Sequence, residues 1–174
     1  GRGHNPEKQK ALDPQGYVLS IARVERHKNQ AGLAYACRQL GYPLKCVGPI
    51  RDTEYAREVA QIGAELLGEV EHGDTMRILA SANVHALPSF GEIISGANCE
   101  AYEMGIPTVM SLEGAEPEYF KTAPHYCDPS NWLDIMEAVK AAWNDTRPRR
   151  ERTLPTWRSV AIKTLEELQA WQGR

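Results

Sequence analysis

Long apolar runs, paired cysteines and an excess of positive charge are all absent from this 174-residue sequence. No stretch approaches the roughly 20 apolar residues that a membrane-spanning helix needs, and no cleavable signal pattern opens the chain. The 20 Lys and Arg against 23 Asp and Glu give a net charge of −3, without the basic stripe of nonspecific nucleic-acid binders. We therefore expect a cytoplasmic globular protein that does not bind nucleic acid.

The four cysteines form no CxxC pair and have no histidine at zinc-binding spacing. Widely spaced cysteines of this kind are typical of reduced, mostly buried residues in a reducing compartment. The pattern predicts neither a disulfide framework nor a metal site. The residues are Cys37, Cys46, Cys99 and Cys127.

Three common catalytic or nucleotide-binding motifs are also missing. The sequence contains no GxGxxG after its first apolar run, no GxxxxGK[ST] and no GxSxG. Their absence excludes the usual dinucleotide-binding domain, the P-loop nucleotidase and the nucleophile-elbow hydrolase.

Six short apolar runs, bounded by turn residues, are present instead. They are too short for helices and rich in Val, Ile, Leu or Tyr, which is typical of buried strands. They cover residues 17–22, 43–48, 65–68, 83–88, 106–111 and 125–128.

Between these runs, apolar residues recur at helical spacing. Asp52 or Thr53 can cap one such segment, Gly41 ends another, Pro129-Ser130 precedes a third, and a last one covers 156–171. Repeated strand–helix alternation predicts a three-layer Rossmann-like α/β domain over residues 17–174, with about six parallel strands and helices on both faces. The polar opening, residues 1–16, is predicted to be a linker.

Ligands of such sheets bind beyond the carboxyl ends of the strands, so residues that follow each run are candidates for the site. Arg23 and Lys28 follow the first run, and fixed cations there suit a diphosphate. A solvated basic loop is, by itself, the more common explanation of such a pair.

The segment 87–109 is the richest in candidate groups. A helix is expected to begin near Ser95 or Gly96, and its first N–H groups favour an anion. Glu92 lies in the preceding loop, and Glu100 lies on the helix beside an apolar stripe. Two solvated surface glutamates would satisfy the same spacing. The stripe consists of Ala97, Ala101 and Met104.

This segment resembles the donor-site signature of the family 4 (group 1) retaining glycosyltransferases of the GT-B fold. The signature is Pro-Ser at a strand end, then Glu, seven residues, Glu-Ala and a closing Gly-x-Pro. The sequence matches with Pro88-Ser89, Glu92, Glu100-Ala101 and Gly105-Ile106-Pro107. Ala22-Arg23 with Lys28-Asn29 resembles the family's stretch after its first strand. Gly68-Glu69-Val70 resembles the stretch that meets the nucleotide base.

The resemblance implies a role for each candidate residue. Glu100 would bind the ribose, Arg23 and Lys28 would neutralise the diphosphate as catalytic cations, and Glu92 would contact the donor sugar. Backbone N–H groups of Ser95, Gly96 and Ala97 would reach the diphosphate, while Gly68 and Val70 would lie at the base. No metal or further cofactor is implied, because the cations and the helix dipole would balance the diphosphate charge in place of a metal ion.

The resemblance also implies the reaction and the partners. The chain corresponds to the C-terminal, donor-binding half, which would transfer a sugar from a nucleotide-diphosphate sugar, with retention, to a glycan, lipid or other acceptor, as in polysaccharide biosynthesis. Full activity is expected only with an N-terminal acceptor domain. Arg147, Arg149, Arg150 and Arg152 allow at most a peripheral contact with the inner face of a membrane, and a solvated loop is the more common explanation.

Two other functions remain open from the sequence. One is a nucleotide-sugar-binding module without catalysis, and the other is a sugar-nucleotide epimerase of the GT-B fold. The family's usual Gly-Phe-Gly after the first glutamate is Ile93-Ile94-Ser95 here, which leaves the donor sugar open.

Overall fold

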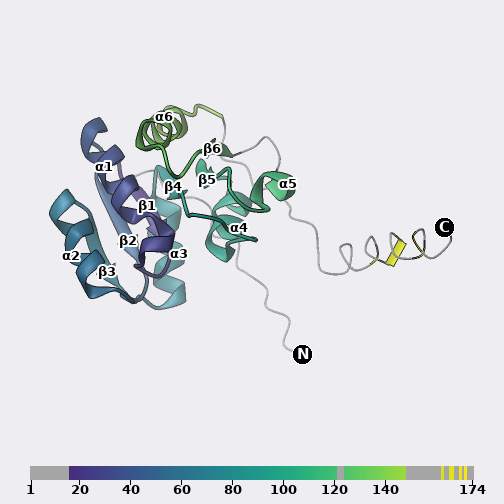
Figure 1. Cartoon of the computed structure of the whole chain (residues 1–174), viewed down its shortest axis with the longest axis horizontal. Helices are drawn as coiled ribbons and strands as arrows, with labels where there is room; N and C mark the ends of the chain where they lie inside the picture. The colour runs from purple at the N-terminus through teal and green to yellow at the C-terminus, as the bar shows by residue number, and fades with distance from the viewer. Residues whose placement is uncertain are drawn as a thin grey trace.

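A computed structural model describes residues 16–120 and 124–147, together with isolated positions between 162 and 171. The described chain forms one six-stranded sheet, and every neighbouring pair of strands is parallel. From one edge of the sheet to the other, the strand order is β3-β2-β1-β4-β5-β6, as the labels in Figure 1 show. The strands are β1 (Val18–Ile21), β2 (Leu44–Val47), β3 (Glu65–Gly68), β4 (Val84–Leu87), β5 (Thr108–Ser111) and β6 (His125–Cys127).

All six predicted strands are confirmed, and the predicted Rossmann-like α/β class is confirmed with them. Most strands are shorter than predicted at their ends, where the backbone turns away from the sheet. The chain builds the sheet outward from β1 to β3 and then returns to add β4 beside β1. The order therefore reverses between β1 and β4, and doubly wound sheets bind ligands at such a point.

Helices α1 to α5 connect successive strands in the described chain, and α6 follows β6. Asp52 caps α2 as predicted, since its carboxylate accepts from the Tyr55 N–H at 2.9 Å. Gly41 ends α1 with a φ of 69°, and the side chain of Asn131 caps α6. The helix predicted over 156–171 lies outside the continuously described residues, as does the linker predicted over 1–16 except for its last residue, Gly16. The helices are α1 (Gln30–Leu40), α2 (Thr53–Ile62), α3 (His72–Ser81), α4 (Gly96–Glu103), α5 (Glu116–Phe120) and α6 (Trp132–Trp143).

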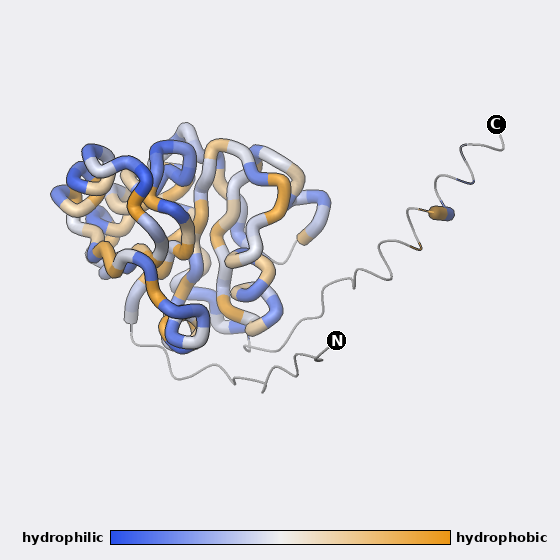
Figure 2. Tube along the Cα trace, turned by 90° about the horizontal axis from the view of Figure 1, so that it is seen from below, coloured by the Kyte–Doolittle hydropathy of each residue, from blue (hydrophilic) through white to orange (hydrophobic). Residues whose placement is uncertain are grey.

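The core lies on both faces of the sheet, as expected when successive strand residues point to opposite sides. Val18 packs with residues of α1, α2 and α6, whereas Leu19 packs with Leu79 of α3 and Ala101 of α4. Figure 2 shows many hydrophobic residues along the central strands and hydrophilic ones on the surrounding helices and loops. The three predicted layers are therefore present.

Trp132 has helical spacing to Met136, Val139 and Trp143, which predicts that it belongs to the core, but this prediction is wrong. Its side chain is 40% exposed and meets Tyr35 edge-on, with 4.9 Å between ring centroids. Trp143 is half-buried and stacks on Tyr42. Helical spacing identifies the face of a helix that a residue lies on, but not how deeply it is buried, and Trp132 is the first residue of α6.

The four cysteines are free, and all but Cys99 are buried. Burial raises the pKa of Cys46 and Cys127 to about 12, so these thiols stay protonated at neutral pH. None of the described helices is both long and apolar enough to cross a bilayer.

Candidate functional site

A cavity of about 300 Å³ opens at the carboxyl ends of β1, β2 and β3. Arg23, Val70 and Glu100, all predicted site residues, line it. Gly68, also a predicted site residue, is the last residue of β3 and directly precedes the lining residues Glu69 and Val70. The remaining lining comes from strand ends and from the start of α3: Ile21, Ala22, Val47, Gly48, Pro49, Glu69, His72 and Thr75.

Backbone hydrogen bonds tie the strand ends that form this cavity. The Ala22 N–H donates to the Val47 carbonyl at 2.9 Å, and the Gly48 N–H donates to the Gly68 carbonyl at 2.8 Å. Gly48 has a φ of 141°, and a Cβ there would lie 2.1 Å from the Ala22 carbonyl oxygen. Only glycine fits this position, because the ends of β1 and β2 approach so closely.

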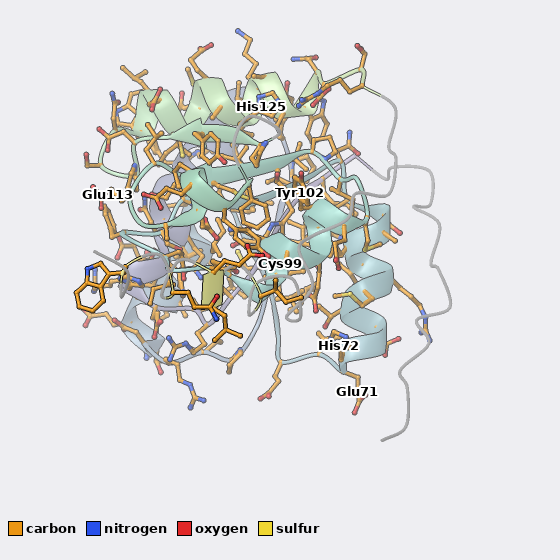
Figure 3. All side chains as sticks on the ribbon, turned by 90° about the vertical axis from the view of Figure 1, so that its right-hand side faces the viewer. Glu71, His72, Cys99, Tyr102, Glu113 and His125 are labelled. Atoms are coloured by element: carbon orange, nitrogen blue, oxygen red, sulfur yellow. The ribbon has the colours of Figure 1, made fainter. Side chains whose placement is uncertain are left out.

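Glu100 reaches the cavity from the second turn of α4, and His72 lies at the start of α3. Figure 3 shows Glu71 and His72 at the start of α3, with Cys99, the residue before Glu100, on α4 above them. Burial raises the pKa of the half-buried Glu100 carboxyl, while His72 acts to lower it. A carboxylate held in such a place is a strong acceptor for the hydroxyl groups of a ligand.

Arg23 follows β1 and lies at the edge of the cavity, with its side chain 56% exposed. Its guanidinium pairs with Glu25 at 3.0 Å. The buried Gln30 side chain donates to the Arg23 carbonyl at 2.8 Å, so the backbone of Arg23 is fixed while its side chain reaches into solvent. An exposed ion pair of this kind contributes little stability and exchanges readily.

A second group of candidates lies where three loops meet. The Phe90 N–H of the β4–α4 loop donates to the His27 carbonyl of the β1–α1 loop at 2.9 Å. The Ala115 N–H of the β5–α5 loop donates to the Glu92 carbonyl, also at 2.9 Å. A Cβ on Gly114 would lie 2.0 Å from that Glu92 carbonyl oxygen. The loops are thus joined through their backbones.

Lys28 and Glu92 form an ion pair at this junction. Their side chains are only 13% and 12% exposed, so each neutralises the charge of the other where little solvent reaches. The structure therefore brings together two residues that were predicted to act on different parts of one donor.

The start of α4 lies beside this pair. The Ser95 N–H donates to the Glu116 carboxylate at 3.1 Å, so it is already engaged within the protein. The N–H groups of Gly96 and Ala97, in the first turn, have no partner among the described residues. Glu100 follows one turn later, about 6 Å along the helix axis. One helix thus carries open amides and the cavity carboxylate.

Sequence reasoning missed Glu25, Glu116, Asn98 and His85. Glu25 and Glu116 lie in a loop and at a short helix, where no periodicity marks them. Asn98 carried a signal: it lies three residues before Ala101, on the face of α4 that packs inward, and both are fully buried. Among the described residues, no group of three or more His, Cys, Asp or Glu is arranged to hold a metal ion.

A doubly wound sheet with a polar cavity at the carboxyl ends of its strands defines a Rossmann-like ligand-binding domain. The sequence model of the family "Glycosyl transferases group 1" matches residues 2–154. The chain belongs to this family, as the resemblance implied. No curated protein matches the chain.

Solved structures show the same fold at low sequence identity. A sucrose-phosphate synthase from Thermosynechococcus elongatus is 19% identical, with a TM-score of 0.70, and the match covers 93% of this chain and 47% of that one. The catalytic domain of cholesterol-α-glucosyltransferase from Helicobacter pylori is 20% identical, with a TM-score of 0.62, covering 77% and 90%.

An α,α-trehalose-phosphate synthase from Burkholderia xenovorans is 13% identical, with a TM-score of 0.65, covering 77% of this chain and 36% of that one. These likenesses show the Rossmann-like fold of GT-B glycosyltransferases. The chain spans about half the length of the sucrose-phosphate synthase.

Proposed function

We propose that the chain is the donor-binding half of a glycosyltransferase, which holds a nucleotide-diphosphate sugar while its sugar moves, with retention, to an acceptor. One observation carries the proposal: Glu100 and Arg23 line a single cavity at the carboxyl ends of β1–β3, in a chain of the group 1 family. The cavity offers a carboxylate for hydroxyl groups and a cation for phosphate.

The nucleoside would occupy this cavity. Its base would lie against Val70 and the turn at Gly68, and its ribose hydroxyls would donate to Glu100. The partly apolar lining and the half-buried carboxylate support this placement, because pockets that bind small molecules combine apolar walls with a few polar groups.

The diphosphate would extend from the cavity along the start of α4. Arg23, Lys28 and the open amides of Gly96 and Ala97 would bind it, at the end of the helix that favours anions. Lys28 would exchange its partner Glu92 for phosphate, and Glu92 would then accept hydrogen bonds from the donor sugar. The Lys28–Glu92 contact supports this exchange, since both groups already lie within reach of one point.

The bond from the anomeric carbon of the sugar to the phosphate oxygen would break in the reaction. Its electron pair stays on the diphosphate, and the two cations with the helix amides would stabilise that charge without a metal. The acceptor hydroxyl oxygen would form the new bond to the anomeric carbon, and its proton would pass to the departing diphosphate oxygen.

We further propose that the acceptor is held by a second domain. The match to about half of the sucrose-phosphate synthase supports this. Cytoplasmic location, a peripheral membrane contact and a role in polysaccharide biosynthesis stay predictions.

Calorimetric titration of the 174-residue chain with UDP, GDP, ADP and their glucose conjugates tests donor binding. We expect one base to be preferred, with weak affinity because only one half of the cleft is present. If none of these compounds binds at millimolar concentration, the proposed function is contradicted.

A further inference from the structure

Glu116, at the start of α5, is a carboxylate that is fully buried. Its Oε1 accepts hydrogen bonds from the Ser95 N–H at 3.1 Å and from Asn98 Nδ2 at 2.7 Å. Its Oε2 has no partner in the described chain. Burying a carboxylate is unfavourable unless its hydrogen bonds compensate, so this residue needs an explanation beyond packing.

Asn98, which donates to Glu116, lies on α4 between that carboxylate and His85 of β4. It is fully buried, and its Oδ1 has no partner among the described residues. It lies close enough to His85 to act against the burial that lowers the pKa of that imidazole to about 4. His85 is therefore neutral at physiological pH. Its Nε2 accepts from the Ile21 N–H at 3.4 Å, which places the imidazole proton on Nδ1.

These side chains form a buried polar series between the two parts of the candidate site. Ile21 lines the cavity at the end of β1, and Ser95 precedes the first turn of α4. His85, Asn98 and Glu116 lie between them, on β4, α4 and α5. His85 Nδ1 and Asn98 Oδ1 have no hydrogen-bond partner among the described residues, so these buried polar side chains do not form a continuous hydrogen-bonded chain.

We propose that Glu116 is a positioning residue that fixes the start of α4, so that the Gly96 and Ala97 amides are held ready for the diphosphate of a donor. Asn98, which lies in the same helix, donates the second hydrogen bond to this carboxylate. The inference rests on the proposed function and adds a residue through which the donor site is ordered.

The local structure shows why α4 needs this support. Ser95 makes no side-chain cap to α4, and an uncapped helix start leaves its N–H groups without acceptors. Glu116 supplies an acceptor from another element and places negative charge at the favoured end of the helix. Burial raises the pKa of Glu116, while its hydrogen bonds with Asn98 and Ser95 act to lower it.

The effect should be selective for the phosphate part of a ligand. The nucleoside cavity is lined mainly by β1, β2, β3 and α3, and Glu100 of α4 lies one turn beyond the start of that helix. The two hydrogen bonds that Glu116 accepts come from Ser95 and Asn98, which do not line the cavity. Loss of Glu116 would therefore disturb the amides of Gly96 and Ala97 while leaving most of the nucleoside contacts in place. A residue that only stabilised the fold would not separate the two ligand classes.

The test compares Glu116→Ala and Glu116→Gln with wild type and with Glu103→Ala, an exposed glutamate at the end of α4. Dissociation constants are measured by calorimetry for the preferred nucleoside diphosphate and for its nucleoside, with the melting temperature of each variant. Glu116→Ala should weaken the diphosphate by about tenfold, the loss of a buried charged hydrogen bond, and the nucleoside by less than about twofold. Glu116→Gln should recover most of the affinity, because its amide oxygen can accept the same two bonds.

Equal losses for both ligands, or no loss for either, would overturn the inference. If Glu116→Ala does not fold, Asn98→Ala takes its place: it removes one of the two donors to Glu116, and its loss must also fall on the diphosphate. A wild-type chain that binds no nucleotide contradicts the proposed function as well. A wild type that binds, with Glu116→Ala unchanged, contradicts only the role of Glu116.

Discussion

Replacing Glu100 with alanine should weaken nucleoside and nucleotide binding alike. The carboxylate lines the nucleoside cavity from α4, and a ligand hydroxyl bonded to a charged group contributes about 1.5–3 kcal/mol. The expected loss is therefore about ten- to a hundredfold in dissociation constant. Stability should hardly change, because burial already disfavours the charged form of Glu100 and alanine is a good helix former.

Replacing Arg23 with alanine should give a smaller loss that depends on the ligand. The Arg23 side chain is more than half exposed and must leave Glu25 to reach a phosphate, so its net contribution should be about 1 kcal/mol, or about fivefold. The affinity of Arg23→Ala should fall for the nucleoside diphosphate and not for the nucleoside, which has no phosphate group for Arg23 to bind.

Calorimetry with the preferred nucleoside diphosphate and with its nucleoside measures both variants, and circular dichroism checks that they fold. Glu103→Ala is the matched control, since it removes an exposed glutamate from the same helix and should bind like wild type. Equal affinity of folded wild type and Glu100→Ala would refute the reasoning, and Glu100 would then be an ordinary surface glutamate.

Two further perturbations test the parts that hold the site. Burial lowers the pKa of His85 from 6.5 to about 4, so the unfolded chain gains a proton at a higher pH than the folded chain. As the pH falls from 6.5 to 4, His85 should therefore lower the free energy of unfolding by about 3 kcal/mol. Denaturant unfolding over that range should show a smaller loss of stability in His85→Gln, and equal losses in the variant and the wild type would contradict the assignment. Gly114→Ala would place a Cβ 2.0 Å from the Glu92 carbonyl oxygen, at a φ of 110°, and should lower both stability and diphosphate affinity. Gly73→Ala on α3, whose Cβ would meet nothing within 4 Å, should cause no such loss, and similar behaviour of the two variants would contradict the close loop contact.

The elements of the fold were predictable because their signals are local. The apolar runs at β1 and β4 mark buried strands, and Asp52 and Gly41 mark helix ends, each within a few residues of chain. The place of the cavity follows from the parallel arrangement, which puts the residues after β1 and β3 at one edge. The strand order does not follow from it and came only from the structure.

The interactions of the site were less predictable because they join distant segments. Lys28 and Glu92 are 64 residues apart, and Ser95 and Glu116 are 21 apart. No spacing rule specifies which carboxylate meets which cation across loops, since backbone contacts such as that of Phe90 with His27 decide it. Sequence reasoning could name Glu92 and Lys28 as candidates, but it could not predict that they pair.

The most direct test of the account maps where a nucleotide binds. Uniformly ¹⁵N-labelled chain is titrated with UDP, GDP and ADP, and amide shifts are followed by two-dimensional NMR. Binding at the proposed site should shift the amides of Arg23, Val70, Gly96, Ala97 and Glu100, around the cavity and the start of α4. Shifts confined to the face formed by α1, α2 and α6, or no shifts with any of the three, would contradict it.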